Sequence, residues 1–323
     1  MKAYLGVDGG GSKTDFLLVD ESGHVLAAHR AGSAYYPETG IDALHQMLAT
    51  GIQATLQQAR RVATQVEFSF IGLPAYGEDS KLLGRLDAIA DAVLPAGRYR
   101  CGNDMVCGWA GSLAGCDGIS VIAGTGSIAY GEFESRSARA GGWGELFSDE
   151  GSAHWLAREA LTAFSRMSDG RETISALYSL IREHFQLSGD LDVCGAVYGP
   201  PALARSELAA LAPLVAQAAR DGDVTALRLI QRAAQELAAI INAVRRQLGV
   251  PPSTVLPVSY SGGMFSLQGL LAPLLEASLS AGNQRYEFQA PRLPPMTGAA
   301  IYAAKLAGVV LTPEFIESIA RHR

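Results

Sequence analysis

The apolar positions of the first hundred residues fall into short runs and one helical repeat. Short apolar or alternating runs predict strands. The strand at Asp15–Val19 is followed by a Glu-Ser-Gly turn, which predicts a hairpin. Leu44, Leu48, Ile52 and Leu56 recur every four residues, which indicates an amphipathic helix over Ile41–Val62. A second helix is expected over Leu82–Leu94. The remaining strands are predicted at Lys2–Val7, Asp15–Val19, Val66–Leu73 and Arg98–Gly102.

After a helical stretch at Met105–Leu113, the same order of patterns begins again. A strand, a glycine turn and a second strand follow one another, as they do at the start of the chain. Such self-similarity suggests an internal duplication, with the hinge near Gly115 to Gly118. The strands of this second beginning are expected at Gly118–Ala123, Ile128–Glu134 and Ala138–Gly142.

The rest of the chain is mostly helical in pattern. Asp223 is the expected N-cap of the longest of these helices. Two strands are predicted among them, at Val255–Tyr260 and at Tyr286–Gln289, the second at the edge of a sheet. The expected helices are Ser152–Met167, Glu172–Phe185, Ser206–Arg220, Val224–Leu248, Leu267–Ser280, Thr297–Ala307 and Thr312–Ala320.

Alternation of strands with helices predicts an α/β protein of two domains. We expect the first domain to span residues 1–117 and the second, with a helical insertion, residues 118–311. The last helix, within 312–323, is expected to pack back on the first domain.

Composition narrows the class of protein. The 323 residues are 48% hydrophobic and 18% charged, with a net charge of −6. An acidic surface does not attract nucleic acid or an anionic membrane, so neither is an expected partner. No signal pattern or membrane-spanning run is present in the sequence, which favours the cytoplasm. The cysteines Cys101, Cys107, Cys116 and Cys194 lack CxxC spacing and are expected to be free thiols.

Three glycine turns follow three of the predicted strands. They are DGGGSKT from Asp8, AGTGS from Ala123 and YSGGMF from Tyr260. Glycine lets backbone N–H groups approach phosphate oxygens, and turns at the carboxyl ends of strands can converge on one ligand. None matches GxxxxGK[ST] or a GxGxxG that opens a helix. A plain hairpin turn remains the alternative at Gly124–Gly126, and a helix entry at Gly262–Gly263.

In order and spacing, the three turns resemble the two phosphate motifs and the adenosine motif of the actin-like ATPase superfamily. Together with the Asn103-Asp104 pair and GGWGELFSDEGSAHW at Gly141–Trp155, they resemble the N-acetylglucosamine kinase family within the BadF/BadG group of ATPases. The resemblance covers nearly the whole chain. It implies a duplicated actin-like, ribonuclease H-like fold with an interdomain cleft, use of ATP and Mg²⁺, an amino-sugar substrate and a homodimer.

The resemblance also assigns roles to residues. Asp104 resembles the general base that takes the proton of the sugar 6-hydroxyl, and Asp8 the carboxylate that holds Mg²⁺. The implied nucleotide contacts are Gly9, Gly10, Gly11, Ser12, Lys13, Thr14, Gly124, Thr125, Gly126, Gly262 and Gly263. The implied sugar contacts are Asn103, Asp104, Gly142, Trp143, Gly144, Asp149 and Glu150.

Each of these roles has a structural alternative. Asp104 and Asp149 can cap the helices that follow them, Trp143 can be a core residue, and Lys13 a solvated turn residue. The family also tends to place a sugar-binding asparagine where this chain has Tyr35, which leaves open whether N-acetylglucosamine, glucosamine or a less related acceptor is the substrate.

Two other functions compete with the kinase. The BadF group includes activases that share a [4Fe–4S] cluster between subunits, although the cysteines here form no recognisable ligand run. A sugar-sensing regulator that keeps the fold without transferring phosphate is the second alternative.

Overall fold

The chain divides into two units in the computed structural model, which describes residues 2–267 and 269–321. Unit 1 contains the described residues up to Cys116 and those from Pro291 onward, and unit 2 spans Asp117–Ala290. The expected first boundary was residue 117. The expected second boundary was residue 311, so the segment from Pro291 to Leu311 lies in unit 1 rather than in the second domain.

Unit 1 is built on a five-stranded sheet of order β3-β2-β1-β4-β5, in which β1 to β3 are antiparallel and β4 and β5 run parallel to β1. Its strands are β1 (Ala3–Gly9), β2 (Thr14–Asp20), β3 (Val25–Ala31), β4 (Val66–Leu73) and β5 (Tyr99–Asn103). Its helices are α1 (Tyr36–Thr39), α2 (Ile41–Gln58), α3 (Leu83–Asp87), α4 (Met105–Leu113), α12 (Pro295–Leu306) and α13 (Pro313–Ala320), with a 3-10 turn, η1 (Ala63–Gln65).

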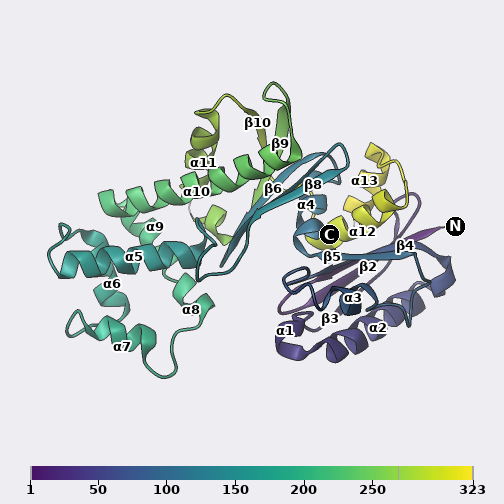
Figure 1. Ribbon diagram of the computed structural model, residues 1–323, viewed down its shortest axis with the longest axis horizontal. Helices are drawn as coiled ribbons and strands as arrows, with labels where there is room; N and C mark the ends of the chain where they lie inside the picture. The colour runs from purple at the N-terminus through teal and green to yellow at the C-terminus, as the bar shows by residue number, and fades with distance from the viewer. Residues whose placement is uncertain (1, 268, 322–323) are drawn as a thin grey trace. The chain divides into compact units, whose positions relative to one another are not determined.

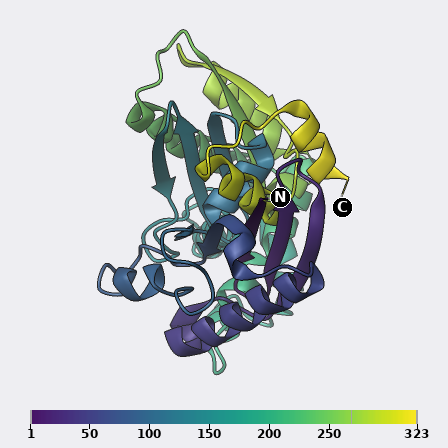
Figure 2. The ribbon, with the colours of Figure 1, turned by 90° about the vertical axis from the view of Figure 1, so that its right-hand side faces the viewer.

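Helices cover both faces of this sheet. Helix α2 lies on one face and α12 on the other (Figure 1). Phe16 of β2 packs against Gly51 of α2, and Phe70 of β4 meets Tyr302 of α12 edge-on, at 4.8 Å between ring centroids. The helix α13 lies beside the hairpin of β2 and β3, where the Phe315 carbonyl approaches Gly23 (Figure 2). The last helix therefore packs on the first strands.

Unit 2 repeats the same sheet. Its order, β10-β9-β6-β7-β8, is that of unit 1 read from the other end, with the same antiparallel and parallel pairs. This equivalence confirms the α/β class and the duplication, and it confirms the last strand as an edge strand. The strands are β6 (Gly118–Ala123), β7 (Ser127–Phe133), β8 (Arg136–Gly141), β9 (Val255–Ser261) and β10 (Arg285–Gln289).

The helical insertion of unit 2 lies between β8 and β9, the place that α1 and α2 occupy in unit 1. Its helices are α5 (Ala153–Ser168), α6 (Ala176–His184), α7 (Asp192–Tyr198), α8 (Arg205–Ala209), α9 (Ala212–Arg220) and α10 (Val224–Leu248); η2 (Gly263–Ser266) and α11 (Leu271–Ser280) follow β9. The α10 helix packs on β7 and β8 and begins at the predicted cap, since the Asp223 carboxylate accepts the Ala226 N–H at 3.0 Å.

Several predicted helices differ from the observed ones; those expected over Ile41–Val62 and Glu172–Phe185, for example, are the shorter α2 and α6. The helix expected over Ser206–Arg220 is two helices, because Pro213, which tolerates only the first turn of a helix, lies at the start of α9. The helix expected over Leu82–Leu94 ends at Asp87, with turns beyond it. The helix expected from Leu267 begins at Leu271, after Gly269 with φ of +74°.

One buried cation fixes the edge of the second sheet. Arg245 of α10 is fully buried and donates to the carbonyls of Arg285, Pro251 and Thr254 at 2.8, 2.6 and 2.7 Å. Its guanidinium also lies 4.9 Å from the centre of the Tyr286 ring. These contacts tie the start of β10 and the approach to β9 to α10, and β9 carries the third glycine turn.

Close packing of α12 on β1 generates a stability prediction. A Cβ on Gly6 would lie 2.1 Å from the backbone nitrogen of Ala300, which cannot rotate away. We expect Gly6→Ala to lower the free energy of unfolding by about 1–3 kcal/mol or more, measured from the urea midpoint.

The matched control is Gly84→Ala in α3, where a Cβ would meet nothing within 4 Å. Alanine there should leave the midpoint unchanged or raise it, since alanine is favoured over glycine in a helix. Equal midpoints for the two variants would contradict this account of the α12 packing.

Candidate functional site

Three parallel strands of unit 1 end together and bring two carboxylates close. Asp8 is near the end of β1, Gly72 is its register partner on β4, and Asp104 directly follows β5. A Cβ on Gly72 would lie 2.3 Å from Cys107 Sγ and 3.2 Å from the Asp104 Cα. Glycine at this position therefore lets the start of α4 lie against the sheet, which places Asp104 beside Asp8.

Burial makes both carboxylates reluctant to ionise. The pKa of Asp8 is raised to about 7, mainly by burial and then by the negative charges of Asp104 and Asp15. Burial likewise raises the pKa of Asp104 to about 6, against the opposing effect of backbone N–H groups at the start of α4. Nearby negative charge and desolvation both favour the protonated acid. We call Asp8, Asp15 and Asp104 the carboxylate cluster.

Asp15 is the member of the carboxylate cluster that has cation partners. It lies opposite Asp8 in the β1–β2 pair and opposite Arg30 in the β2–β3 pair. Arg30 reaches its two oxygens at 2.5 and 3.1 Å, and Lys13 Nζ lies 3.1 Å away. These hydrogen bonds hold the pKa of Asp15 below its usual range although burial opposes them. Lys13 is thus an exposed turn residue with an ion-pair partner.

The first glycine turn is held by its own backbone. Gly10 N–H donates to the Lys13 carbonyl at 2.9 Å, and Ala34 N–H donates to the Gly10 carbonyl at 2.9 Å. Gly11 and Ser12 are exposed at its tip. Thr14 was expected to contact phosphate. Its side chain is instead fully buried, and its hydroxyl donates to the Gly32 carbonyl at 2.8 Å. Thr14 therefore ties β2 to the end of β3.

The start of α4 separates the roles of Asn103 and Asp104. Asn103 Oδ1 accepts the Met105 N–H at 3.1 Å, and its amide nitrogen donates to the Tyr76 carbonyl at 3.4 Å. Asp104 makes no side-chain capping bond to α4. Asn103, expected as a sugar contact, is thus engaged in starting the helix, and the capping alternative for Asp104 does not hold.

The other two glycine turns lie against one another in unit 2. Strands β6 and β9 are parallel neighbours, so the turns that follow them share one edge of the sheet. Gly124 N–H donates to the Gly126 carbonyl at 2.9 Å, and a Cβ on Gly262 would lie 2.3 Å from the Ala123 carbonyl oxygen. Gly262 has φ of +104°, a conformation that glycine adopts without strain.

The second glycine turn also meets the start of α5. The N–H groups of Ala153 and His154 donate to the carbonyls of Gly124 and Thr125 at 2.9 and 3.4 Å. Ser152 caps the helix, its hydroxyl accepting the Trp155 N–H at 3.2 Å. Asp149 is therefore not the cap of α5, and its buried carboxylate is available for another role.

An arginine from the insertion holds Asp149. Arg205, the first residue of α8, forms an ion pair with Asp149 Oδ2 and lies 3.5 Å from Glu145 Oε2. A Cβ on Gly126 would meet both Arg205 and Asp149, so the glycine makes room for this pair. We call Arg205, Asp149 and Glu145 the Arg205 network. Nothing in the sequence pointed to Arg205, which lies 56 residues from Asp149.

The GGWG segment lies at the surface of unit 2. Trp143 is 69% exposed, so it is not a core residue, and the Arg139 guanidinium lies 5.7 Å from its ring centre. Gly142 and Gly144 both have positive φ, of +69° and +101°. The backbone carbonyl of Glu150 accepts the Ser127 hydroxyl at 2.7 Å, which joins DEGS to the second glycine turn.

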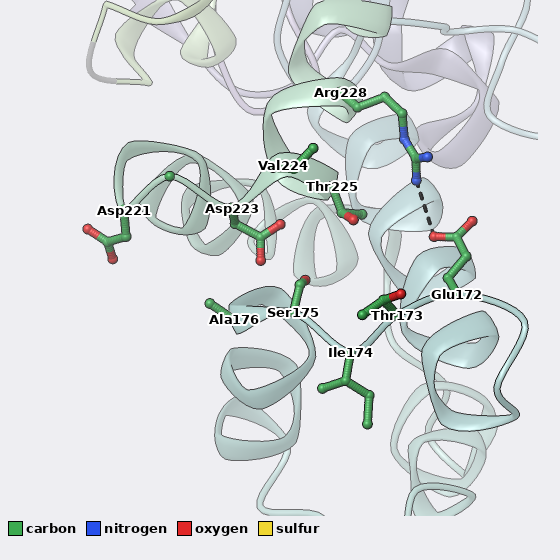
Figure 3. Close-up of a pocket in the computed structure, with 11 residues that line it drawn as sticks. Glu172, Thr173, Ile174, Ser175, Ala176, Asp221, Asp223, Val224, Thr225 and Arg228 are labelled. Atoms are coloured by element: carbon green, nitrogen blue, oxygen red, sulfur yellow. Dashed lines mark hydrogen bonds and ion pairs between the residues drawn. The ribbon is translucent and has the colours of Figure 1, made fainter.

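A pocket of about 590 Å³ in unit 2 contains none of the residues predicted to bind nucleotide, metal or sugar. It lies where α6 and α10 begin, and Arg228 reaches across it to Glu172 at 3.1 Å (Figure 3). Asp223 already accepts N–H groups from both helices, Leu177 at 2.8 Å and Ala226 at 3.0 Å. The helix ends are thus satisfied by the chain itself.

Residues 2–267 and 269–321 contain neither a metal-binding group of side chains nor a membrane-spanning helix. No three His, Cys, Asp or Glu side chains there are grouped so that they could hold a metal ion by themselves. All four cysteines are free, Cys101 and Cys107 buried and the other two exposed. None of the helices in those ranges has the length and apolar character to span a bilayer.

Comparison with known proteins identifies the family. The sequence pattern of the BadF/BadG/BcrA/BcrD ATPase family matches residues 5–303, which include every glycine turn and both carboxylates. The chain belongs to this ATPase family. The match runs across both units of the BadF/BadG/BcrA/BcrD fold described above, so the family's ATP chemistry is expected of the whole chain.

Relatives in this family carry more specific names. The chain is 28% identical over 310 residues to an N-acetyl-D-glucosamine kinase of Dictyostelium discoideum, covering 93% of this chain and 97% of the relative. It is 28% identical over 269 residues to an N-acetylmuramic acid/N-acetylglucosamine kinase of Clostridium acetobutylicum, covering 82% and 86%.

A solved structure agrees with these relatives. A Chromobacterium violaceum protein assigned provisionally as an N-acetylglucosamine kinase has a TM-score of 0.68 and 27% identity, covering 93% of this chain and 98% of its own. A ROK hexokinase of Thermus thermophilus, at 16% identity and a TM-score of 0.55, shares the fold. The resemblance inferred from the motifs is thus confirmed.

The raised pKa of Asp8 predicts how stability depends on pH. The folded protein keeps a proton on Asp8 up to about pH 7, while the unfolded chain releases it near pH 4. The folded state therefore binds more protons between those values, and stability falls as pH rises through this window. Asp8→Asn removes the effect, so its melting temperature should exceed that of the wild type by a few degrees at pH 8 and match it near pH 4.

Thermal unfolding without metal or nucleotide measures this difference. Asp42→Asn is the control, because the Asp42 side chain is 98% exposed, and its melting temperature should follow the wild type at both pH values. If Asp8→Asn were less stable than the wild type at pH 8, the ionised Asp8 carboxylate would not be destabilising the folded protein, and the prediction would be wrong.

Proposed function

We propose that the protein is an ATP-dependent kinase that phosphorylates the 6-hydroxyl of an amino sugar, N-acetylglucosamine or glucosamine. The observation that carries the proposal is Asp104, a half-buried carboxylate free of capping duty, held beside a second carboxylate at the end of three parallel strands. The names of the relatives support the same substrate class.

Asp104 acts as the general base in this proposal. A pKa near 6 keeps the carboxylate ionised at neutral pH and close to the range where a base is effective. Asp104 accepts the hydroxyl proton as the sugar oxygen forms its bond to the γ-phosphorus. The bond from that phosphorus to the β,γ-bridging oxygen breaks, and ADP leaves.

The carboxylate cluster fits a divalent cation. Burial raises the pKa of both Asp8 and Asp104, and the charge of Asp104 raises the pKa of Asp8 further, so a cation here would relieve both. Mg²⁺ binds to one or two carboxylates, with phosphates and water completing its shell. Asp8 would hold the ion. When bound, Mg²⁺ neutralises charge on the phosphate chain.

The glycine turns supply the phosphate and adenosine contacts in this proposal. The turns Gly9 to Lys13 in unit 1 and Gly124 to Gly126 in unit 2 contact the phosphates, chiefly at their exposed tips, because Gly9 is buried and the N–H groups of Gly10 and Gly124 are engaged within the turns. Gly262 and Gly263 serve the adenosine: a Cβ on Gly263 would meet nothing within 4 Å, whereas Gly262 lets the third turn lie against Ala123 of the second. Gly142 to Gly144, Asp149 and Glu150 serve the sugar, and a carboxylate can accept bonds from two neighbouring hydroxyls.

Three finer features remain proposals as well. We infer that the two units serve one reaction, that the protein works in the cytoplasm and that it forms a homodimer. Their support is the family resemblance of the motifs, together with free thiols at all four cysteines for the reducing compartment.

Coupled measurement of ADP release tests the function. We expect N-acetylglucosamine or glucosamine, among a panel of hexoses and hexosamines, to accelerate ADP release. Asp104→Asn should lower kcat by roughly 10²- to 10⁴-fold, the usual contribution of a general base. Asp42→Asn is the exposed control and should keep the wild-type rate. A wild-type rate that no sugar changes, or an Asp104→Asn variant with most of its turnover, would overturn the proposal.

The pH profile tests the role of Asp104 separately. Because the base must be ionised, kcat/KM for the sugar should fall about tenfold per pH unit below pH 6. The residual activity of Asp104→Asn should lack this dependence on that group. A wild-type profile that is flat between pH 5 and pH 8 would exclude a base with the raised pKa of Asp104.

A further inference from the structure

Arg205 reaches the second glycine turn from a distant part of the chain. Its Nη2 forms the ion pair with Asp149 Oδ2, and its Nη1 lies 3.5 Å from Glu145 Oε2. The Asp149 side chain is only 4% exposed, whereas that of Arg205 is 38% exposed. One guanidinium thus bridges the two carboxylates that flank the segment between GGWG and DEGS.

The local structure presents Arg205 in this direction. Arg205 begins α8, a five-residue helix that packs on α5, and Glu207 Oε2 accepts the Ala204 N–H at 2.7 Å just before it. Asp149 has φ of +63°, a left-handed conformation that is uncommon for a residue other than glycine. Such a conformation persists where the surrounding contacts demand it.

Arg205 is also the cation that stabilises the charge on Asp149. Burial raises the pKa of Asp149, and the guanidinium of Arg205 is the largest influence that lowers it, while Glu145 and Glu150 raise it. His154, the other titratable neighbour, has a pKa lowered by burial and by Arg205 and Arg158, so it is neutral at pH 7. Arg158 itself donates to the Glu145 backbone carbonyl at 2.8 Å.

We propose that Arg205 is a positioning residue of the kinase, which holds Asp149 in the orientation that receives two neighbouring hydroxyls of the amino sugar. The inference rests on the proposed function and adds that the helical insertion of unit 2 determines acceptor recognition. Because Arg205 holds one oxygen of the carboxylate, the side chain cannot rotate about its terminal bond. A sugar that lacks one of the two hydroxyls then loses a hydrogen bond to this buried carboxylate, which is a basis for rejection.

The kinetic test compares Arg205→Gln with Arg228→Gln. Arg228 is the matched control, an arginine of the same insertion that pairs with Glu172 away from Asp149. Arg205→Gln should raise the KM for the amino sugar by roughly 10- to 100-fold, the value of a hydrogen bond to a charged group. The KM for ATP and kcat at saturating sugar should change less than about threefold. Arg205→Lys should fall between the two, because one ammonium cannot span both carboxylates.

A second readout separates positioning from a purely structural role. Without the guanidinium, Asp149 should take up a proton at a higher pH, so the sugar KM of Arg205→Gln should rise further as pH falls from 8 to 6. In the wild type that rise should be smaller, because Arg205 lowers the pKa of Asp149. Titration of the Asp149 side-chain carbon by ¹³C NMR reports the same change without any turnover.

The outcomes distinguish the two proposals. If no sugar accelerates ADP release by the wild type, the proposed kinase fails whatever Arg205 does, and the NMR titration then decides whether Arg205 holds Asp149 ionised. If the wild type is an amino-sugar kinase but Arg205→Gln matches Arg228→Gln in sugar KM, the inference is overturned. An equal rise in the KM for ATP and in the KM for sugar would also overturn the inference. Should Arg205→Gln fail to fold, Arg205→Lys decides the same comparison.

Discussion

The close placement of two half-buried carboxylates, Asp8 and Asp104, is the constraint on which the arrangement of unit 1 depends. Asp8 and Asp104 are placed close together in surroundings that raise the pKa of each, an arrangement that does not form unless tight packing imposes it. Gly72 lets α4 approach β4, and Gly298 lets α12 approach α4, where a Cβ would lie 2.1 Å from the Cys107 carbonyl oxygen. Backbone contacts without side chains between them fix the carboxylates more firmly than adaptable side chains would.

The two units treat their buried acids in opposite ways. In unit 1, Asp15 is neutralised by Lys13 and Arg30, while Asp8 and Asp104 form no ion pair with a cation within residues 2–267 and 269–321. In unit 2, Asp149 already has Arg205. Duplicated sheets therefore carry different electrostatics: one leaves negative charge for a ligand to neutralise, and the other keeps a neutralised carboxylate that can accept hydrogen bonds. This difference suits chemistry at the first and recognition at the second.

The sequence predicts well what is local and less well what is not. Val66–Leu73, Met105–Leu113, Gly118–Ala123 and Val224–Leu248 match observed elements residue for residue, because each apolar run ends at a clear stop such as Pro74 or Gly249. The split between α8 and α9 was missed although Pro213 signalled it. The α7 helix has no buried residues, so it gave no apolar periodicity.

The site shows the same limit. The motifs located Asp8, Asp104 and Asp149, because glycine turns and strand ends are local signals. Thr14 and Asn103 were predicted to contact ligands, but their side chains hydrogen-bond to Gly32 and Met105. Only the fold shows which partner a short polar side chain has. The role of Arg205 could not be predicted from the sequence, because 56 residues and three helices separate it from its partner Asp149.

The return of the chain to unit 1 has a consequence for biosynthesis. The face of the first sheet that carries Gly6 and Phe70 is covered by α12, which the ribosome makes only after the whole of unit 2. Unit 2 is one continuous segment and can fold as soon as it has been synthesised, whereas an apolar face of unit 1 stays exposed until α12 is made. We therefore expect the nascent chain to complete its second half before its first, and the waiting face to be the surface that chaperones recognise.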